Sequence, residues 1–258
     1  MNRQPEAAVR SVAPLSLAER LEAGSEALSL DIGLHERERL LSYVSLMQRW
    51  NRVYNLTAVR DPEAMLVQHV LDSLAVLNPL RASVMNIARP RLVDVGSGAG
   101  LPGLVLAVVW PELDVDLVEP VGKKAAFLRQ SIADLGLAGR VRAHDCRVES
   151  LSRESDGDEV VASAAGALAS RTTGSKQVRA PDLIICRAFA SLADYARSIA
   201  DLASPATAIF AMKARRSEID AESAALPEHW RVLDIAPLSV PGLDAERHLV
   251  RLAAPLKH

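Results

Sequence analysis

The chain has 258 residues, of which 49% are hydrophobic and 24% are charged, and its formal net charge is −2. This composition is typical of a globular protein and excludes wholesale disorder, and no apolar run approaches the ~20 residues that a membrane span needs. The small net charge excludes nucleic-acid binding through a global positive field, so any such binding depends on a local basic surface.

Several site types are absent from the sequence. Neither of the two cysteines lies in a spacing typical of a metal site, and no Ser/His/Asp set or pair of acids stands out. The N-terminus also lacks the apolar core of a signal peptide. We therefore expect a cytoplasmic protein without a bound metal and without hydrolase chemistry.

The N-terminal third has helical periodicity. Residues 1–15 show no period, and we expect them to form a mobile tail. Apolar residues recur at helical spacing from about residue 16, and again from Met65 until Asn78-Pro79 ends the run. This pattern predicts a helical N-terminal cap over 16–80.

A glycine-rich run, LVDVGSGAGLPG at 92–103, follows the predicted cap. It predicts a buried strand, then a tight turn that opens a helix, and Gly96 and Gly98 lie where a ligand could contact bare backbone. The spacing D-x-G-x-G-x-G from Asp94 favours S-adenosylmethionine. The G-x-G-x-x-G spacing of 98–103 keeps NAD open as an alternative.

The next predicted strand ends in an acid, Glu119, about 20 residues beyond the glycines. A carboxylate at this position is placed to accept hydrogen bonds from both hydroxyls of a ribose, and it disfavours the 2′-phosphate of NADP. The alternative is that Glu119 only caps the helix that follows.

Strands and helices alternate from Arg91 onward, and we therefore assign residues 81–258 to a doubly wound α/β domain of the Rossmann-like type. We expect seven strands in a mostly parallel sheet, at 91–95, 114–119, 140–144, 182–187, 206–212, 231–237 and 247–253. Residues 151–180 break this rhythm with small and polar residues, and we interpret them as a flexible insertion.

Polar residues that follow the later strands are candidates for the ligand edge of the sheet. We interpret Arg187 as facing a ligand rather than as an ion-pair partner, and His248 as structural rather than as a general base. The turn [DNS]-P-P-[YFW], typical of enzymes that methylate exocyclic amines, is absent after 182–186. This absence favours an acceptor without a proton to lose, such as a ring nitrogen.

These features together resemble the ribosomal RNA small-subunit guanine-N7 methyltransferase family called RsmG or GidB. The resemblance covers roughly residues 40–252. It depends on WNRVYNLTAVRD (50–61), HVLDSL (69–74), the glycine run with LPG (101–103), GKK (122–124), FL (127–128), RVE (147–149), RAFAS (187–191) and ERH (246–248).

The resemblance implies a class I S-adenosylmethionine-dependent methyltransferase that modifies N7 of one guanine in 16S rRNA. It implies cofactor contacts at Gly96, Leu101, Val148, Glu149 and Arg187, to which the glycine and ribose arguments add Gly98 and Glu119. Because N7 carries a lone pair and no proton, we expect a positioning mechanism without a catalytic acid or base.

The implied partner is 16S rRNA or the small ribosomal subunit, and we expect a monomer that does not associate with membranes. We expect the RNA to contact a basic surface and an aromatic side chain, and we assign these roles to Lys213, Arg215, Arg216, Arg247 and Phe189, with Arg187 beside them. An NAD-dependent oxidoreductase and a non-catalytic nucleotide-binding accessory protein remain the alternatives.

Overall fold

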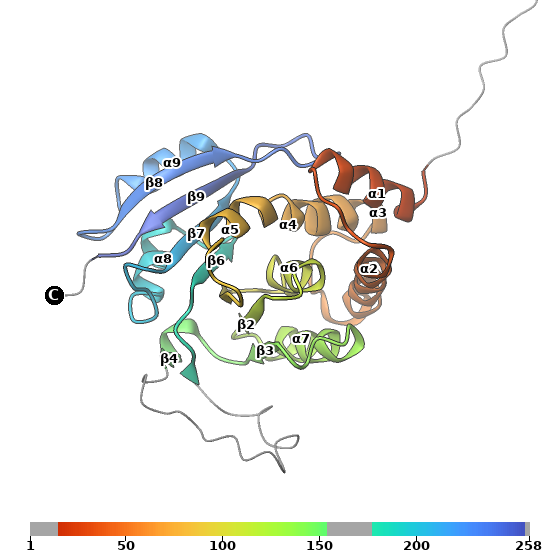
Figure 1. The fold of residues 1–258 in the computed structure, drawn as a ribbon, viewed down its shortest axis with the longest axis horizontal. Helices are drawn as coiled ribbons and strands as arrows, with labels where there is room; N and C mark the ends of the chain where they lie inside the picture. Colours follow the sequence, from red (N-terminus) through yellow and green to blue (C-terminus); the bar gives the residue numbers. More distant parts are fainter. Residues whose placement is uncertain (1–14, 154–176, 256–258) are drawn as a thin grey trace, which may run out of the picture.

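The computed structural model describes residues 15–153 and 177–255, and its centre is a seven-stranded sheet (Figure 1). The strand order is β3-β2-β1-β6-β7-β9-β8; β9 is antiparallel to both of its neighbours, and the other neighbouring pairs are parallel. The strands are β1 (Arg91–Val95), β2 (Asp114–Val118), β3 (Val141–His144), β6 (Leu183–Arg187), β7 (Ala208–Lys213), β8 (Arg231–Pro237) and β9 (His248–Ala253). The predicted α/β fold with seven mostly parallel strands is confirmed.

The central strands are apolar because both of their faces are covered. Leu92 and Leu183 project into one hydrophobic cluster, which contains the N-terminal helices, and their neighbours Val93 and Ile184 project into a second cluster on the opposite face. The alternation of side chains along each strand therefore divides one apolar run between two cores.

Helices cover both faces of the sheet (Figure 1). The first cluster receives the helices that precede β3, and the second receives the two helices that follow β6 and β7. The helices are α1 (Leu17–Ala27), α2 (Leu34–Tyr54), α3 (Pro62–Met65), the π-helix η1 (Leu66–Leu71), α4 (Asp72–Leu74), α5 (Leu77–Ser83), α6 (Gly103–Val109), α7 (Gly122–Asp134), the 3-10 helix η2 (Val148–Ser150), α8 (Leu192–Ser198) and α9 (Arg216–Ser223).

The N-terminal helices begin at residues suited to capping. Ser16 and Glu19 form a capping box before α1, and the Asp61 carboxylate accepts from the Ala64 N–H at 2.7 Å in front of α3. Apolar side chains of these helices share one continuous cluster with β1, β2 and β6. The helical segment predicted as a cap thus contributes directly to the core under the sheet.

Two further short strands, β4 (Ser152–Arg153) and β5 (Gln177–Val178), pair in parallel at the edges of the predicted insertion. The sequence pattern does not indicate these strands. Residues 154–176, which form most of the segment interpreted as a flexible insertion, lie outside the described residues, as do 1–14 of the predicted mobile tail. None of the described helices combines the length and hydropathy that crossing a membrane would require.

Candidate functional site

The glycine run forms the loop between β1 and α6 at the carboxyl edge of the sheet. Gly96, Gly98 and Gly100 have φ values of +67°, +59° and +90°, which only glycine adopts at little cost. A Cβ added at Gly96 would find no atom within 4 Å, so the space beside this backbone is open. The loop thus offers a ligand a bare backbone edge.

Asp94, at the base of the loop, fixes the start of α6. Its Oδ2 accepts from the Gly103 N–H at 2.8 Å, and a Cβ at Gly103 would lie 2.7 Å from the same oxygen. The side chain is fully buried, and burial raises the pKa of its carboxyl to about 7. Oδ1 is buried without a hydrogen-bond partner in the described residues, which leaves an acceptor at the base of the loop.

Glu119 joins the glycine loop to the start of α7. Its Oε2 accepts from the Gly98 N–H at 2.8 Å and its Oε1 from the Val121 N–H at 2.9 Å. Val121 is the N-cap residue of α7, so the bond to its N–H agrees with the alternative that Glu119 caps this helix. The bond to the Gly98 N–H is not part of such a cap. Each oxygen keeps a further lone pair, and the ribose role of Glu119 stays a prediction.

The other expected cofactor contacts lie close to the same edge. Val148 and Glu149 are in η2, just beyond β3, with Val148 buried and Glu149 exposed. Leu101 is also buried, with its side chain in the core. Leu101 and Val148 are 3% and 5% exposed, so each offers a ligand only a small accessible surface.

Arg187, at the end of β6, is held by an ion pair. Its Nη1 donates to Asp72 Oδ2 at 3.1 Å and to the Gln68 carbonyl at 3.0 Å. Asp72 Oδ1 accepts from Arg247 Nε at 3.0 Å, and the Asp72 side chain is only 2% exposed. The two roles considered for Arg187 are thus not exclusive, because it pairs with a buried acid and also lines a pocket.

This strand-end pocket has a volume of about 350 Å³ and lies beyond β6 and β7. It is lined by Asp72, Arg187, Ala188, Phe189, Ala190, Met212, Lys213, Ala214, Glu218, Glu222 and Arg247. Val95 pairs with Cys186 across β1 and β6, so the glycine loop and Arg187 leave neighbouring strands at the same edge. The reversal of strand order between β1 and β6 is where doubly wound sheets bind ligands.

The residues assigned to RNA divide into two groups. Phe189, Lys213 and Arg247 line the strand-end pocket; Lys213 pairs with Glu222 at 2.8 Å, and the Phe189 ring packs on Tyr195. Arg215 and Arg216 lie outside the lining and form exposed ion pairs with Glu218 and Asp220. The structure brings the first group together and places the second on the adjoining surface.

Two histidines lie near this edge. His248 Nδ1 is 2.7 Å from the Ala214 carbonyl, an acceptor that requires Nδ1 to carry the proton. His69 is buried in η1 with Nε2 2.9 Å from Thr57 Oγ1, and burial together with the charge of Arg187 lowers its pKa to about 4.

Asp72 is the residue of this site to which sequence reasoning gave no role. The sequence feature that could have indicated Asp72 is its charge, because it lies within the apolar helical run of 65–77. In the described residues, no three His, Cys, Asp or Glu side chains come close enough together to bind a metal ion.

Comparisons with known proteins agree with this geometry. Residues 36–250 match the family model GidB, described as rRNA small subunit methyltransferase G. A relative named ribosomal RNA small subunit methyltransferase G, from Methylibium petroleiphilum, is 43% identical over 93% of this chain and 97% of its own length. A relative of the same name from Leptothrix cholodnii is 45% identical over 89% and 92%.

Solved structures match in fold. A crystal structure of a mutant of MtNAS aligns with a TM-score of 0.52 and 16% identity, over 93% of this chain and 86% of that one. The same mutant in complex with S-adenosylmethionine aligns with a TM-score of 0.50 and 17% identity, over 93% and 88%. At this level of identity the match concerns the fold, a Rossmann-like sheet of the class I methyltransferase type.

Proposed function

Because the chain belongs to the rRNA small subunit methyltransferase G family, we propose that it transfers the methyl group of S-adenosylmethionine to N7 of a guanine in 16S rRNA. The observation that carries the proposal is the pairing of β1 with β6, which sets the open glycine loop beside a pocket whose lining includes Phe189 and the cations Arg187, Lys213 and Arg247. A methyl donor in the loop and a base in the pocket would then be neighbours.

The residues around the loop fit this cofactor. Gly96 leaves space beside the backbone, and the buried Oδ1 of Asp94, at the loop's base, has no hydrogen-bond partner in the part of the chain that the structure describes. We infer that Gly96, Gly98 and the main chain of Leu101 bind the cofactor and that Glu119 accepts from its ribose. Val148, Glu149 and Arg187 complete the assignment.

The proposed reaction requires the protein to position the two reactants and does not require it to transfer a proton. The cofactor supplies a sulfonium-activated methyl group, and guanine N7 is a nucleophile with an in-plane lone pair and no proton to lose. The side chains therefore have to orient the base and exclude water. The hydrogen bond from His248 Nδ1–H to the Ala214 carbonyl agrees with the structural role expected for this residue.

The partner that we propose is 16S rRNA, either alone or within the small ribosomal subunit. Lys213, Arg247, Arg215 and Arg216 would contact phosphates, and Phe189 would stack on an unpaired base. A ribosomal substrate places the proposed activity in the cytoplasm, and a monomer without a metal ion remains our expectation.

Methyl transfer to unmodified ribosomal subunits tests the proposed function. Small subunits that lack the modification are incubated with the protein and labelled S-adenosylmethionine, and borohydride/aniline cleavage maps 7-methylguanine in 16S rRNA. We expect incorporation at a single guanine. Label on another atom or on many sites would contradict the proposal, and so would calorimetry that shows binding of NAD but not of S-adenosylmethionine.

A further inference from the structure

Asp72 connects three parts of the fold that are far apart in the chain. It lies in α4. Its Oδ2 pairs with Arg187 at the end of β6, and its Oδ1 pairs with Arg247 just before β9. The arginine side chains are 23% and 24% exposed, whereas Asp72 is 2% exposed. One buried acid thus holds two partly exposed guanidinium groups at fixed positions.

Both guanidinium groups keep donors for a ligand. Arg187 uses Nη1 for its two bonds, and Arg247 uses Nε for Asp72 and Nη1 for the Glu246 carbonyl. No acceptor among the described residues is hydrogen-bonded to Nη2 of either arginine. Since each Nη2 carries two N–H groups, the pair can bind one anion from two sides.

The charge balance of the strand-end pocket favours an anion at this place. Lys213 is matched by Glu222, and the lining acid Glu218 is matched by Arg215. The two arginines on Asp72 carry two positive charges against one negative charge. The charged lining residues sum to zero, and because Glu218 is paired with Arg215 from outside the lining, one unmatched positive charge is left at the two arginines.

We propose that Asp72 is a positioning residue that holds Arg187 and Arg247 as one fork for an RNA phosphate next to the target guanine. The inference rests on the proposed function and names how that site binds its substrate. No residue of 96–103 lines the strand-end pocket, which favours RNA over the carboxylate of the cofactor as the anion. Holding two long side chains in place before binding removes part of their entropic cost on binding.

The variant Asp72→Asn separates positioning from simple charge. Removal of a negative charge would by itself strengthen RNA binding, whereas loss of positioning weakens it. We expect KM for unmodified small subunits to rise about tenfold or more, which corresponds to the loss of one good charge-assisted contact. Because Arg187 is also assigned to the cofactor, the calorimetric Kd of S-adenosylmethionine is measured in the same variant, and it should rise by less than KM.

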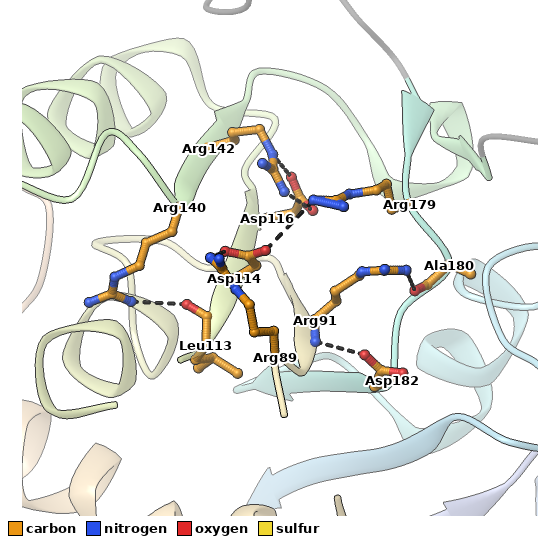
Figure 2. Close-up of polar contacts among 10 residues, drawn as sticks. All are labelled: Arg89, Arg91, Leu113, Asp114, Asp116, Arg140, Arg142, Arg179, Ala180 and Asp182. Carbon is orange, nitrogen blue, oxygen red and sulfur yellow. Dashed lines mark hydrogen bonds and ion pairs between the residues drawn. The ribbon is translucent and has the colours of Figure 1, made fainter. Parts of the chain in front are cut away.

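Asp114→Asn is the matched control. Asp114 also pairs with two arginines, Arg89 at 3.3 Å and Arg179 at 3.7 Å, but it begins β2 and so lies at the opposite edge of the sheet (Figure 2). This variant changes the charge by the same amount and should leave KM for the subunits unchanged. An equal rise in both variants would overturn the inference, as would an unchanged KM in Asp72→Asn.

A second variant covers a failure of Asp72→Asn to fold. Arg247→Lys keeps the charge but removes the planar guanidinium, so we expect it to raise KM for the subunits while the cofactor Kd stays constant. An unchanged KM, or a rise confined to the cofactor Kd, would overturn the inference. If the protein without substitutions transfers no methyl group, the proposed function is wrong. Equilibrium binding of 16S rRNA by the same variants would then still test the fork.

Discussion

At the scale of single residues, the structure separates the roles of the glycines that the sequence presents as one run. Gly96 is exposed and faces open space, whereas Gly103 is buried against Leu117 and Asp94. One glycine thus serves the proposed ligand, and the other serves the packing of α6 on the sheet.

Gly96→Ala and Gly103→Ala should therefore have different effects. Alanine at Gly96 meets no atom but keeps a positive φ, which costs about 1 kcal/mol of the free energy of unfolding. It should raise the Kd of S-adenosylmethionine by about tenfold or more. Alanine at Gly103 meets Leu117 Cδ2 at 2.5 Å and should cost about 1–3 kcal/mol. Denaturant unfolding and calorimetry measure both quantities, and equal cofactor affinities would contradict the assignment of Gly96.

His69 should make stability depend on pH. Its pKa is lowered to about 4 from an ordinary value of 6.5, so the unfolded chain binds more protons between these values. The stabilisation from neutral His69 is complete above pH 6.5 and is lost as the pH falls towards 4, by about 3 kcal/mol.

His69→Gln, which has no titrating group, should reduce this acid-side loss. The difference between the two proteins isolates His69, because the raised pKa of Asp94 contributes equally to both and acts in the opposite direction. Free energies of unfolding from urea titrations at pH 4.5 and 7 provide the comparison. Parallel pH profiles would show that His69 does not titrate in this way.

At the scale of elements, arginines join the ends of helices to strands. Arg140, just before β3, donates to the Leu113 carbonyl at 2.9 Å (Figure 2). It also donates to the Trp110 carbonyl at 3.3 Å and to the Ala107 carbonyl. These carbonyls lie at the end of α6 and in the turn that follows it. One side chain thus supplies the donors that the end of a helix lacks.

Arg140→Ala should cost about 2–4 kcal/mol of the free energy of unfolding, because it leaves several carbonyls without a donor. Arg89→Ala is the control, since the side chain of Arg89 is 68% exposed and its ion pair with Asp114 should be worth about 1 kcal/mol or less. Chemical denaturation of both variants tests the difference. A similar cost at the two positions would mean that the carbonyls find water in place of Arg140.

At the scale of the whole molecule, the small net charge of −2 makes the local basic surface decisive for RNA. Lys213, Arg247, Arg215, Arg216 and Arg187 are five cations on one side of the sheet edge, and each phosphate contact contributes a slope of about −0.7 to −0.9 to log K against log salt. A global field cannot supply this binding.

RNA affinity should consequently fall by about 10²-fold between 50 and 200 mM salt. This decrease is the one expected for four or five phosphate contacts. The Kd of S-adenosylmethionine should change little, because its proposed site offers mainly backbone groups. Fluorescence anisotropy with labelled rRNA and calorimetry with the cofactor give the two slopes. An RNA affinity that does not change with salt would contradict the proposed role of the basic surface.

The sequence by itself determined the seven strands of the main sheet, the glycine loop and the family. Side-chain alternation and glycine spacing are local properties, which is why the predicted strand at 91–95 coincides with β1 and why the loop falls at the edge where ligands bind. The order of the short motifs along the chain could be read without knowing any contact between them.

Only the tertiary structure decided how the charged residues pair. Asp72 is 115 positions from Arg187 and 175 from Arg247 in the chain. The sequence predicted that Arg187 faces a ligand, but it did not show that Arg187 and Arg247 both pair with Asp72. Burial likewise sets the pKa of Asp94 and His69. Pairing and burial depend on which distant segments the folded chain brings together, and periodicity along the sequence carries no information about that distance.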